Sequence, residues 1–245
     1  MNYVSSIGLY FIMIKDTFRR MTKRSVLWKL IFQEINDLVL KSMGIVTFIS
    51  FFIGAVVTIQ TALNLNNPLI PKELIGYAAR QSILLEFAPT FVSVIMAGKV
   101  GSYITSSIGT MRVTEQIDAL EVMGINSLNY LVFPKIIAML MYPFLIGIAM
   151  FVGIMGAYLA GVYGGFLDSA QFLTGLRDDF IPFHVFYAFF KTLVFAFLLA
   201  TIPAYHGYYM KGGALEVGKA STTSFVWTSV VIIITNYVIT QLLLS

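Results

Sequence analysis

The sequence predicts an all-α membrane protein with an N-terminal interfacial amphipathic helix, five transmembrane helices and a short polar helix between the second and third spans. Of its 245 residues, 58% are hydrophobic and 11% are charged, whereas soluble domains carry about 25% charged residues. The polar surface is too small to cover a globule, so the apolar excess must face lipid. Five apolar stretches are long enough to cross a hydrocarbon core of about 30 Å.

Residues 1–41 form the predicted N-terminal domain of interfacial or elbow helices. The apolar run within residues 1–14 is too short to span a membrane. A basic stretch follows it, consisting of Lys15, Arg19, Arg20, Lys23, Arg24 and Lys29. Residues 25–40 place apolar side chains near one helix face and include Trp28, which is typical of a helix lying in the membrane interface. A soluble helix packed on another element is the alternative; a span beginning directly afterwards favours the interfacial position.

Residues 42–245 form the predicted five-span domain, with spans at about 42–64, 74–109, 136–162, 184–205 and 225–244. In the second span, Pro89 lacks the amide that would bond the Leu85 carbonyl, so we expect a kink near Glu86. Small residues recur at four-residue spacing in two spans and predict close helix packing in lipid. The two series are Ser93, Ala97, Gly101, Thr105 and Gly109, and Ala149, Gly153, Ala157 and Gly161. The expected packing residues among them are Ala97, Gly101, Gly109, Gly153 and Gly161.

A polar helix pattern follows the second span directly. Glu115, Asp118 and Glu121 lie three residues apart within it. A membrane helix that runs into a short acidic helix is typical of a span that presents a docking element to a soluble partner. We therefore predict a protein-binding helix at this point of the chain.

Basic residues set the predicted orientation. They are frequent before residue 42 and occur near the polar helix and between the fourth and fifth spans, whereas the loops 64–73 and 164–182 hold Lys72 and Arg177 against four acids. The positive-inside rule places the basic segments in the cytoplasm. The N-terminus is then cytoplasmic and, after five spans, the C-terminus lies outside.

Composition argues against several kinds of site. The chain has no cysteine, and its two histidines, His184 and His206, lie in different segments, so we expect no metal site and no catalytic residues. Residues 213–220 nearly match a phosphate-binding loop, but Ala220 replaces the hydroxyl that would hold Mg²⁺ and a membrane span follows. We expect no nucleotide site here, and no nucleic-acid partner, because the basic residues flank membrane segments.

Glu86 is an ionisable residue in an apolar stretch beside Pro89. Such a residue at membrane depth indicates a functional site or a buried partner, and Arg80 and Lys99 are the partners considered. The alternative is that Glu86 lies near the outer interface and stays solvated. The sequence leaves both interpretations open.

The segment GTMRVTEQIDALEVMGI, residues 109–125, resembles the MlaE-type permease family, the ABC transporter permeases of the Mla/MCE phospholipid transport systems. The similarity extends to EFAP and AGKVGS within residues 86–102, YLVFPKIIA at 130–138 and HGYYMKGGALEVGKAS at 206–221. Together these motifs cover most of residues 44–240.

The resemblance implies a homodimeric permease with two ATPase subunits (MlaF-like) and an MCE-domain protein (MlaD-like) on the outer side. Such systems move phospholipids between the inner and outer membranes of Gram-negative bacteria, which places the chain in the bacterial inner membrane. ATP and Mg²⁺ would bind the partner ATPase, so this chain would be no enzyme and would hold no cofactor. Residues 113–123 become the expected coupling helix in a groove of the ATPase, with the coupling residues Arg112, Thr114, Glu115, Gln116, Asp118 and Glu121.

One departure from the family pattern concerns the second span. The family commonly has Arg-Glu-Leu-Gly-Pro where this chain has LEFAP, residues 85–89. The arginine of a possible headgroup-binding Arg–Glu pair is replaced by Leu85, so this role carries over only for Glu86. The expected lipid-cavity residues are Glu86, Pro89 and Arg80, the last as a substitute source of positive charge.

Two other function classes compete with this prediction. A secondary transporter of a lipid or amphipathic substrate would need no ATPase, but it predicts matched internal repeats, which are not found. An enzyme acting on membrane lipids would need an acid–base or metal constellation, which is also missing. Co-purification of an ATPase subunit distinguishes the ABC permease from both.

Overall fold

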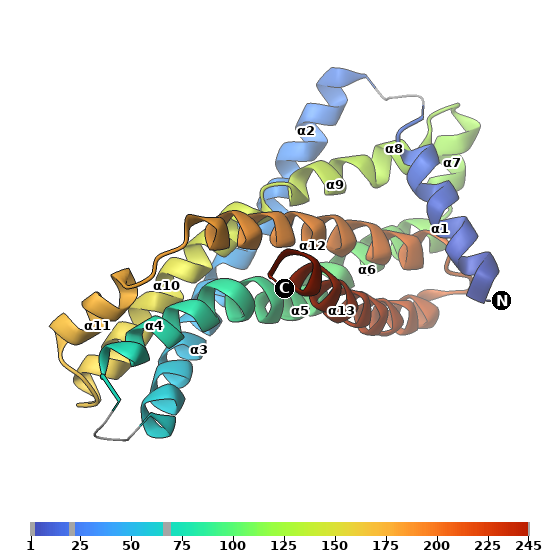
Figure 1. Cartoon of the computed structure of the whole chain (residues 1–245). Helices are drawn as coiled ribbons and strands as arrows, with labels where there is room; N and C mark the ends of the chain where they lie inside the picture. The colour runs from blue at the N-terminus through green and yellow to red at the C-terminus, as the bar shows by residue number, and fades with distance from the viewer. Residues whose placement is uncertain (1–2, 20–22, 66–69, 245) are drawn as a thin grey trace. The chain divides into compact units, whose positions relative to one another are not determined.

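The structure is a computed structural model that describes residues 3–19, 23–65 and 70–244 (Figure 1). Within these ranges the regular elements are all helices. Five helical runs are long and apolar enough to cross a membrane: Arg24–Asn64, Glu73–Val113, Ser127–Tyr163, Pro182–Tyr208 and Ala214–Leu244. The predicted all-α class with five spans is therefore confirmed. Arg20 of the basic stretch and residues 66–69 of the first predicted loop lie outside the described residues.

The chain forms two compact units. Unit 1 comprises Met1–Lys41, Val94–Tyr142 and Leu193–Leu242, and unit 2 comprises Ser42–Ser93, Pro143–Thr192 and Leu243–Ser245. One unit boundary coincides with the predicted division between residues 41 and 42. A separate domain at residues 1–41 stays a prediction.

The N-terminal region begins with α1 (Tyr3–Thr17) and α2 (Arg24–Glu34). A π-helical segment, η1 (Ile35–Val39), and a 3-10 turn, η2 (Leu40–Ser42), connect α2 to α3 (Met43–Asn64). No proline lies between Arg24 and Asn64, and no glycine lies before Gly44, so the helical run continues without a break through η1 and η2. The predicted interfacial helix and the first predicted span are therefore parts of one helical run.

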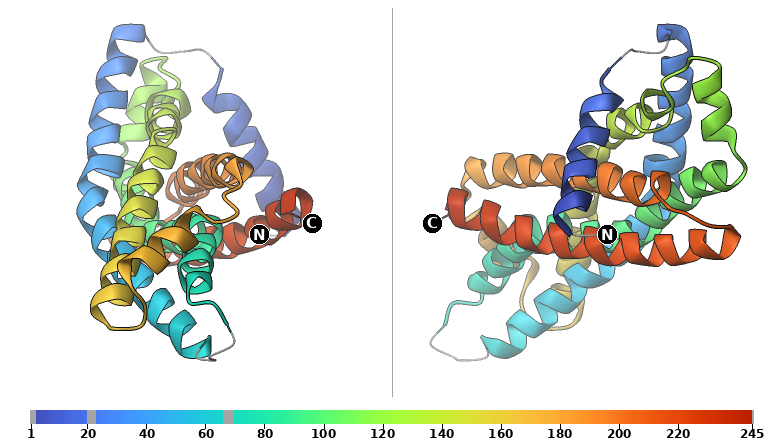
Figure 2. Two further views of the ribbon diagram at one scale, coloured as in Figure 1. Left: turned by 60° about the vertical axis from the view of Figure 1, so that its left-hand side comes forward. Right: turned by 90° about the vertical axis from the view of Figure 1, so that its right-hand side faces the viewer.

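The two faces of α2 differ in burial. Leu27 and Ile31 are buried, and the helix packs along α9 (Phe133–Met139) within unit 1 (Figure 2). Trp28 and Phe32 are exposed. An aromatic exposed face suits a helix in contact with lipid; its position in the membrane interface stays a prediction.

The second run contains two π-helical segments, and Pro89 lies in the first of them. Proline cannot donate the usual bond to the carbonyl four residues earlier, and the wider π turn accommodates its ring. The predicted disturbance near Glu86 thus takes the form of a π-helical segment. The run consists of α4 (Glu73–Ser82), η3 (Ile83–Phe91), α5 (Val92–Met96), η4 (Ala97–Gly101) and α6 (Ser102–Val113).

The third run starts earlier than predicted. After α7 (Gln116–Val122), the helices α8 (Ser127–Leu131), α9 and α10 (Tyr142–Tyr163) follow with only short interruptions. Pro134 does not delay the start of the run to residue 136, because it lies in the first turn of α9, where a missing amide removes no helical bond.

The last elements are α11 (Ser169–Arg177), α12 (Pro182–Tyr208) and α13 (Ala214–Leu244). The fifth run begins at Ala214 and not near residue 225, so the predicted loop over 206–221 is reduced to residues 209–213. Gly212 turns the chain with a φ of 114°. The sequence after it is rich in helix-forming residues, and this explains the early start of α13.

Glycines allow close helix contacts inside each unit. In unit 2, a Cβ atom on Gly54 of α3 would lie 1.9 Å from the carbonyl oxygen of Gly153 on α10. In unit 1, a Cβ on Gly109 would lie 2.9 Å from the sulfur of Met210, and one on Gly101 would lie 3.3 Å from Pro203. Of the other small residues singled out in the sequence, Gly161 packs beside Leu167, and Ala97 is fully buried.

Candidate functional site

Glu86 and Lys191 form an ion pair within unit 2. Glu86 lies on η3 and Lys191 on α12, and 2.9 Å separates the lysine Nζ from the glutamate Oε1. The lysine side chain is fully buried, whereas 38% of the glutamate side chain is exposed. The hydroxyl of Thr90 donates to Oε2 at 3.1 Å. The carboxylate is therefore the accessible member of the pair.

The ammonium group of Lys191 makes three contacts. Besides Glu86, its Nζ donates to the carbonyl oxygen of Leu85 at 2.9 Å and to the hydroxyl of Tyr187 at 3.0 Å. An ammonium group has three protons, so these contacts satisfy it. In an α-helix, the Leu85 carbonyl would accept from the amide that Pro89 lacks. Removing one partner from a buried pair typically costs ~3–5 kcal/mol, and the partial exposure of Glu86 puts this pair near the lower end.

The structure gives Glu86 a different partner from the two considered in the sequence. Arg80 is buried, and its Nη1 donates to the carbonyl oxygens of Leu176 at 2.6 Å and Asp178 at 2.9 Å. Carbonyls at the end of a helix lack intrahelical donors, so Arg80 caps the end of α11. Lys99 donates to the carbonyl of Lys41 in unit 1. Arg80 thus fixes a turn, and Lys191 supplies the positive charge beside Glu86.

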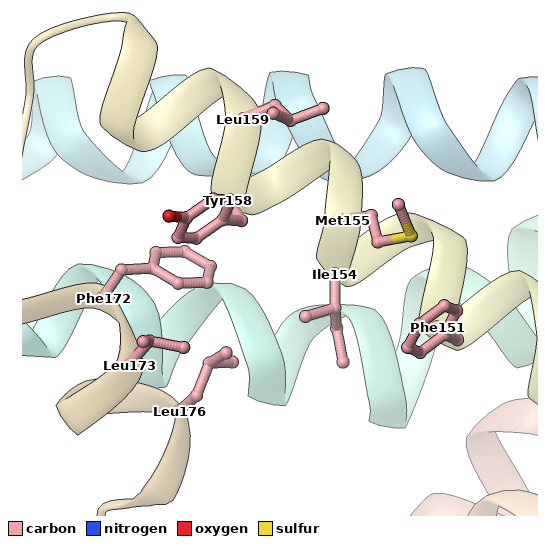
Figure 3. A pocket seen from close by; sticks show the side chains of 8 residues that line it. All are labelled: Phe151, Ile154, Met155, Tyr158, Leu159, Phe172, Leu173 and Leu176. Carbon is pink, nitrogen blue, oxygen red and sulfur yellow. The ribbon is translucent and has the colours of Figure 1, made fainter. Parts of the chain in front are cut away.

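An apolar groove of about 440 Å³ lies between α10 and α11 in unit 2 (Figure 3). The rings of Tyr158 and Phe172 meet edge to face with centroids 5.5 Å apart, and the Tyr158 hydroxyl lies 2.9 Å from Ser169 Oγ. None of the lining side chains is charged, so the groove favours hydrocarbon over polar solutes. The lining residues are Phe151, Ile154, Met155, Tyr158, Leu159, Phe172, Leu173 and Leu176.

A tight turn separates the predicted coupling helix from the second run. Glu115 adopts a left-handed conformation with φ 57° and ψ 15°, which costs a non-glycine residue ~1 kcal/mol or more. Arg112 and Asp118 bridge the turn, with Nη1 2.8 Å from Oδ1. The predicted helix at 113–123 is therefore a turn followed by the shorter α7.

The outer surface of α7 combines acidic and apolar groups. Val122 and Met123 are 89% and 65% exposed. Ile117 on the inner face is fully buried and anchors the helix. Exposed apolar side chains beside acids are typical of a protein-docking surface. Of the predicted coupling residues, Arg112 is half-buried, and Thr114, Glu115, Gln116, Asp118 and Glu121 are exposed.

Glu121 takes part in a ring of three hydrogen-bonding groups in unit 1. Its Oε1 accepts from the hydroxyls of Ser127 and Tyr208, each at 3.0 Å, and those two hydroxyl oxygens lie 2.9 Å apart. The three residues belong to α7, α8 and α12 respectively. We call this set the Glu121 ring. It attaches α7 to the end of α12.

The segment that nearly matches a phosphate-binding loop is helical. Helix α13 begins at Ala214, and Lys219 pairs with Glu216 of the same helix at 2.7 Å. A phosphate-binding loop needs an open, glycine-rich backbone before its helix, and here the helix already occupies the corresponding residues.

A family model described as Permease MlaE matches residues 31–242. The chain belongs to the MlaE permease family. A probable ABC transporter permease protein of Rickettsia bellii is 35% identical over 238 residues, covering 97% of this chain and 92% of that protein. A probable ABC transporter permease protein of Synechocystis is 36% identical over 226 residues, covering 86% and 80%.

A plant protein is also similar to this MlaE family member. The chloroplastic protein TRIGALACTOSYLDIACYLGLYCEROL 1 of Arabidopsis thaliana is 32% identical over 234 residues, covering 91% of this chain and 63% of that protein. Family membership and the five membrane-length helices make this chain a multi-pass membrane permease of the ABC transporter class, which works with an ATPase partner.

Sequence reasoning missed two residues of this MlaE permease. Lys191 is the one Lys, Arg, Asp or Glu between residues 182 and 208. The rule that charges within a membrane span indicate functional sites would have identified it. Tyr208 carries no comparable signal, because the tyrosines around it look alike in the sequence. Its contact with Glu121 joins residues 87 positions apart.

Proposed function

We propose that this chain is the permease subunit of an ABC transporter that moves phospholipids between the inner and outer membranes of a bacterium. Two copies would assemble with two ATPase subunits in the cytoplasm and with an MCE-domain protein on the outer side. The observation that carries the proposal is α7, an exposed acidic and apolar helix between two membrane-length runs in an MlaE family member.

The proposed mechanism starts at α7. ATP-driven closure of the ATPase subunits pushes on α7 and tilts the run Glu73–Val113, to which the turn at Glu115 joins it. The π-helical segment η3 within that run supports this step, because such segments often mark functional deformation. The tilt changes the width of a lipid cavity between the two permease copies, where the exposed carboxylate of Glu86 contacts the cargo.

The ATP chemistry belongs to the partner in this proposal. ATP and Mg²⁺ bind the ATPase subunits, and this chain contributes binding, positioning and movement without a catalytic residue of its own. Residues 214–220 are helical and not an open phosphate-binding loop, which supports the assignment of ATP binding to the partner.

Two observations support a lipid as the cargo. The groove between α10 and α11 is lined without a charged side chain, so it suits hydrocarbon. The name of the plant relative refers to a galactose-bearing diacylglycerol lipid. Lipid identification by mass spectrometry on the purified complex tests the substrate class, and a cargo other than glycerophospholipid would overturn it.

The coupling assignment is tested by charge reversal on α7. We expect Glu115→Lys with Asp118→Lys to abolish ATPase binding, or to leave ATP hydrolysis without lipid movement, because both acids are exposed, one in the turn before α7 and one on α7. Glu216→Lys is the matched control, since it reverses an acid on α13 whose side chain is 42% exposed. Normal assembly and transport by the double variant would refute the assignment. Transport by the lone chain without ATP would favour a secondary transporter.

A further inference from the structure

The Glu121 ring connects α7 to a second membrane-length helix. The run Glu73–Val113 is joined to α7 through the chain itself, whereas the hydroxyl of Tyr208 joins α12 to α7. The first of these helical runs carries Glu86, and α12 carries Lys191. Both members of the charged pair therefore lie on helices attached to α7.

The chemistry of the ring makes it responsive to small movements of α7. Two hydroxyl protons, from Ser127 and Tyr208, serve three contacts, of which two end on the same carboxylate oxygen. Bonds to a carboxylate are stronger than those between neutral groups, so Glu121 is the dominant acceptor. A displacement of Glu121 therefore stretches or moves its direct hydrogen bond with the Tyr208 hydroxyl.

Contacts outside the ring also hold α7 in place. Ile117 is fully buried beneath α7, and the ion pair between Arg112 and Asp118 closes the preceding turn. Glu121 itself is exposed, so water can replace a lost hydroxyl partner. Loss of the Tyr208 hydroxyl should leave the fold intact and weaken the link by which a movement of α7 reaches α12.

We propose that Tyr208 is a positioning residue that transmits the movement of α7 to α12. The ATPase then acts on two helices, on Glu73–Val113 through the chain and on α12 through the Glu121 ring. This inference rests on the proposed function of α7 as the docking element for the ATPase. It adds a second path for the movement of α7, which leads to α12, the helix that carries Lys191.

The test uses the full complex of permease and ATPase subunits in proteoliposomes. Tyr208→Phe removes the hydroxyl and keeps the ring, and we expect the number of lipids moved per ATP hydrolysed to fall about fivefold or more, the lower limit of typical coupling between sites. The amount of bound ATPase and its KM for ATP should not change. Ser127→Ala, which removes a different member of the ring, should lower the same ratio.

Tyr209→Phe is the matched control, because its hydroxyl takes no part in the ring, and it should keep the wild-type ratio. An unchanged ratio in Tyr208→Phe overturns the inference. So does a loss of bound ATPase, or a failure of both ring variants to accumulate, since Tyr208 would then be structural. If the proposed function itself is wrong, the wild-type permease chain binds no ATPase or moves no lipid.

Discussion

Lys191 lies fully buried against Glu86, and its Nζ bonds at the same time to the carboxylate of Glu86 and to the backbone carbonyl of Leu85. One ammonium group thus joins α12 both to the charge and to the backbone of η3. The pair therefore has a structural role as well as the proposed role at the lipid cavity. These two roles can be separated by mutation.

The first prediction concerns the coupling energy of this pair. Glu86→Leu should lower the free energy of unfolding by ~3 kcal/mol, because it leaves a buried ammonium without its counter-charge. Adding Lys191→Met should recover most of that loss, since the double variant buries no charge. Equilibrium unfolding in mixed micelles measures the cycle. Simple additivity of the two losses would mean that the residues do not interact.

An exposed pair serves as the control for that cycle. Glu216 and Lys219 are 2.7 Å apart, but their side chains are 42% and 64% exposed. Exposed pairs contribute ~1 kcal/mol or less. Replacing either residue by Gln should change the free energy of unfolding little.

Arg80→Lys tests the capping role of the arginine. Lysine cannot reproduce the guanidinium that bonds the carbonyls of Leu176 and Asp178 and lies 5.0 Å from the centroid of the Tyr77 ring. We expect faster amide exchange over residues 169–181, since hydrogen bonds to charged groups contribute ~1.5–3 kcal/mol. Arg177→Lys, on the exposed last turn of α11, is the control. Equal exchange in both variants would contradict the assignment.

Glu115 and Gly124 provide opposite tests of backbone strain around α7. Glu115→Gly should raise the free energy of unfolding by up to ~1 kcal/mol, because glycine adopts the observed φ of 57° without a steric penalty. Gly124→Ala should lower it by a similar amount, since φ is 74° there. A Cβ on Gly124 would meet no atom within 4 Å, so the loss of stability in Gly124→Ala would come from backbone strain alone. Unfolding changes of the same sign would refute this explanation.

Gly54→Ala should disrupt the contact between α3 and α10. The new methyl group would lie 1.9 Å from the carbonyl oxygen of Gly153, so the helices must separate; overpacking of this kind costs ~1–3 kcal/mol. Gly44→Ala on the same helix is the control, because its Cβ would meet nothing within 4 Å. The midpoint of thermal unfolding should fall only for Gly54→Ala. Equal midpoints would show that the helices adapt.

The sequence predicts the spans better than their ends. Long uncharged stretches report membrane-length helices directly, and Pro89 correctly indicates where the second run departs from α-helical geometry. The start at Ser127 is missed because Pro134 looks like a helix breaker but lies in the first turn of α9. The start at Ala214 is missed because residues 206–221 look like a glycine-rich turn, although Gly218 lies inside α13.

The candidate site is harder to predict because its contacts are distant in the chain. Lys191 and Glu86 are 105 positions apart, and helical spacing reveals only neighbours three or four residues away. Arg80 is closer to Glu86 in sequence, but its guanidinium bonds the carbonyls of Leu176 and Asp178. The part of α12 up to Thr192 belongs to the same unit as η3, and this decides the pairing.

The bond from Lys191 to the Leu85 carbonyl makes one helix depend on a side chain of another. Pro89 has no amide to donate within its own helix, and a lysine from α12 bonds to the Leu85 carbonyl of that helix. The two positions therefore form a compensating set. If a residue with an amide stood at position 89, α-helical geometry would let that amide bond to the Leu85 carbonyl, which would then need no donor from position 191. Substitutions at positions 89 and 191 should therefore be tolerated together more readily than singly.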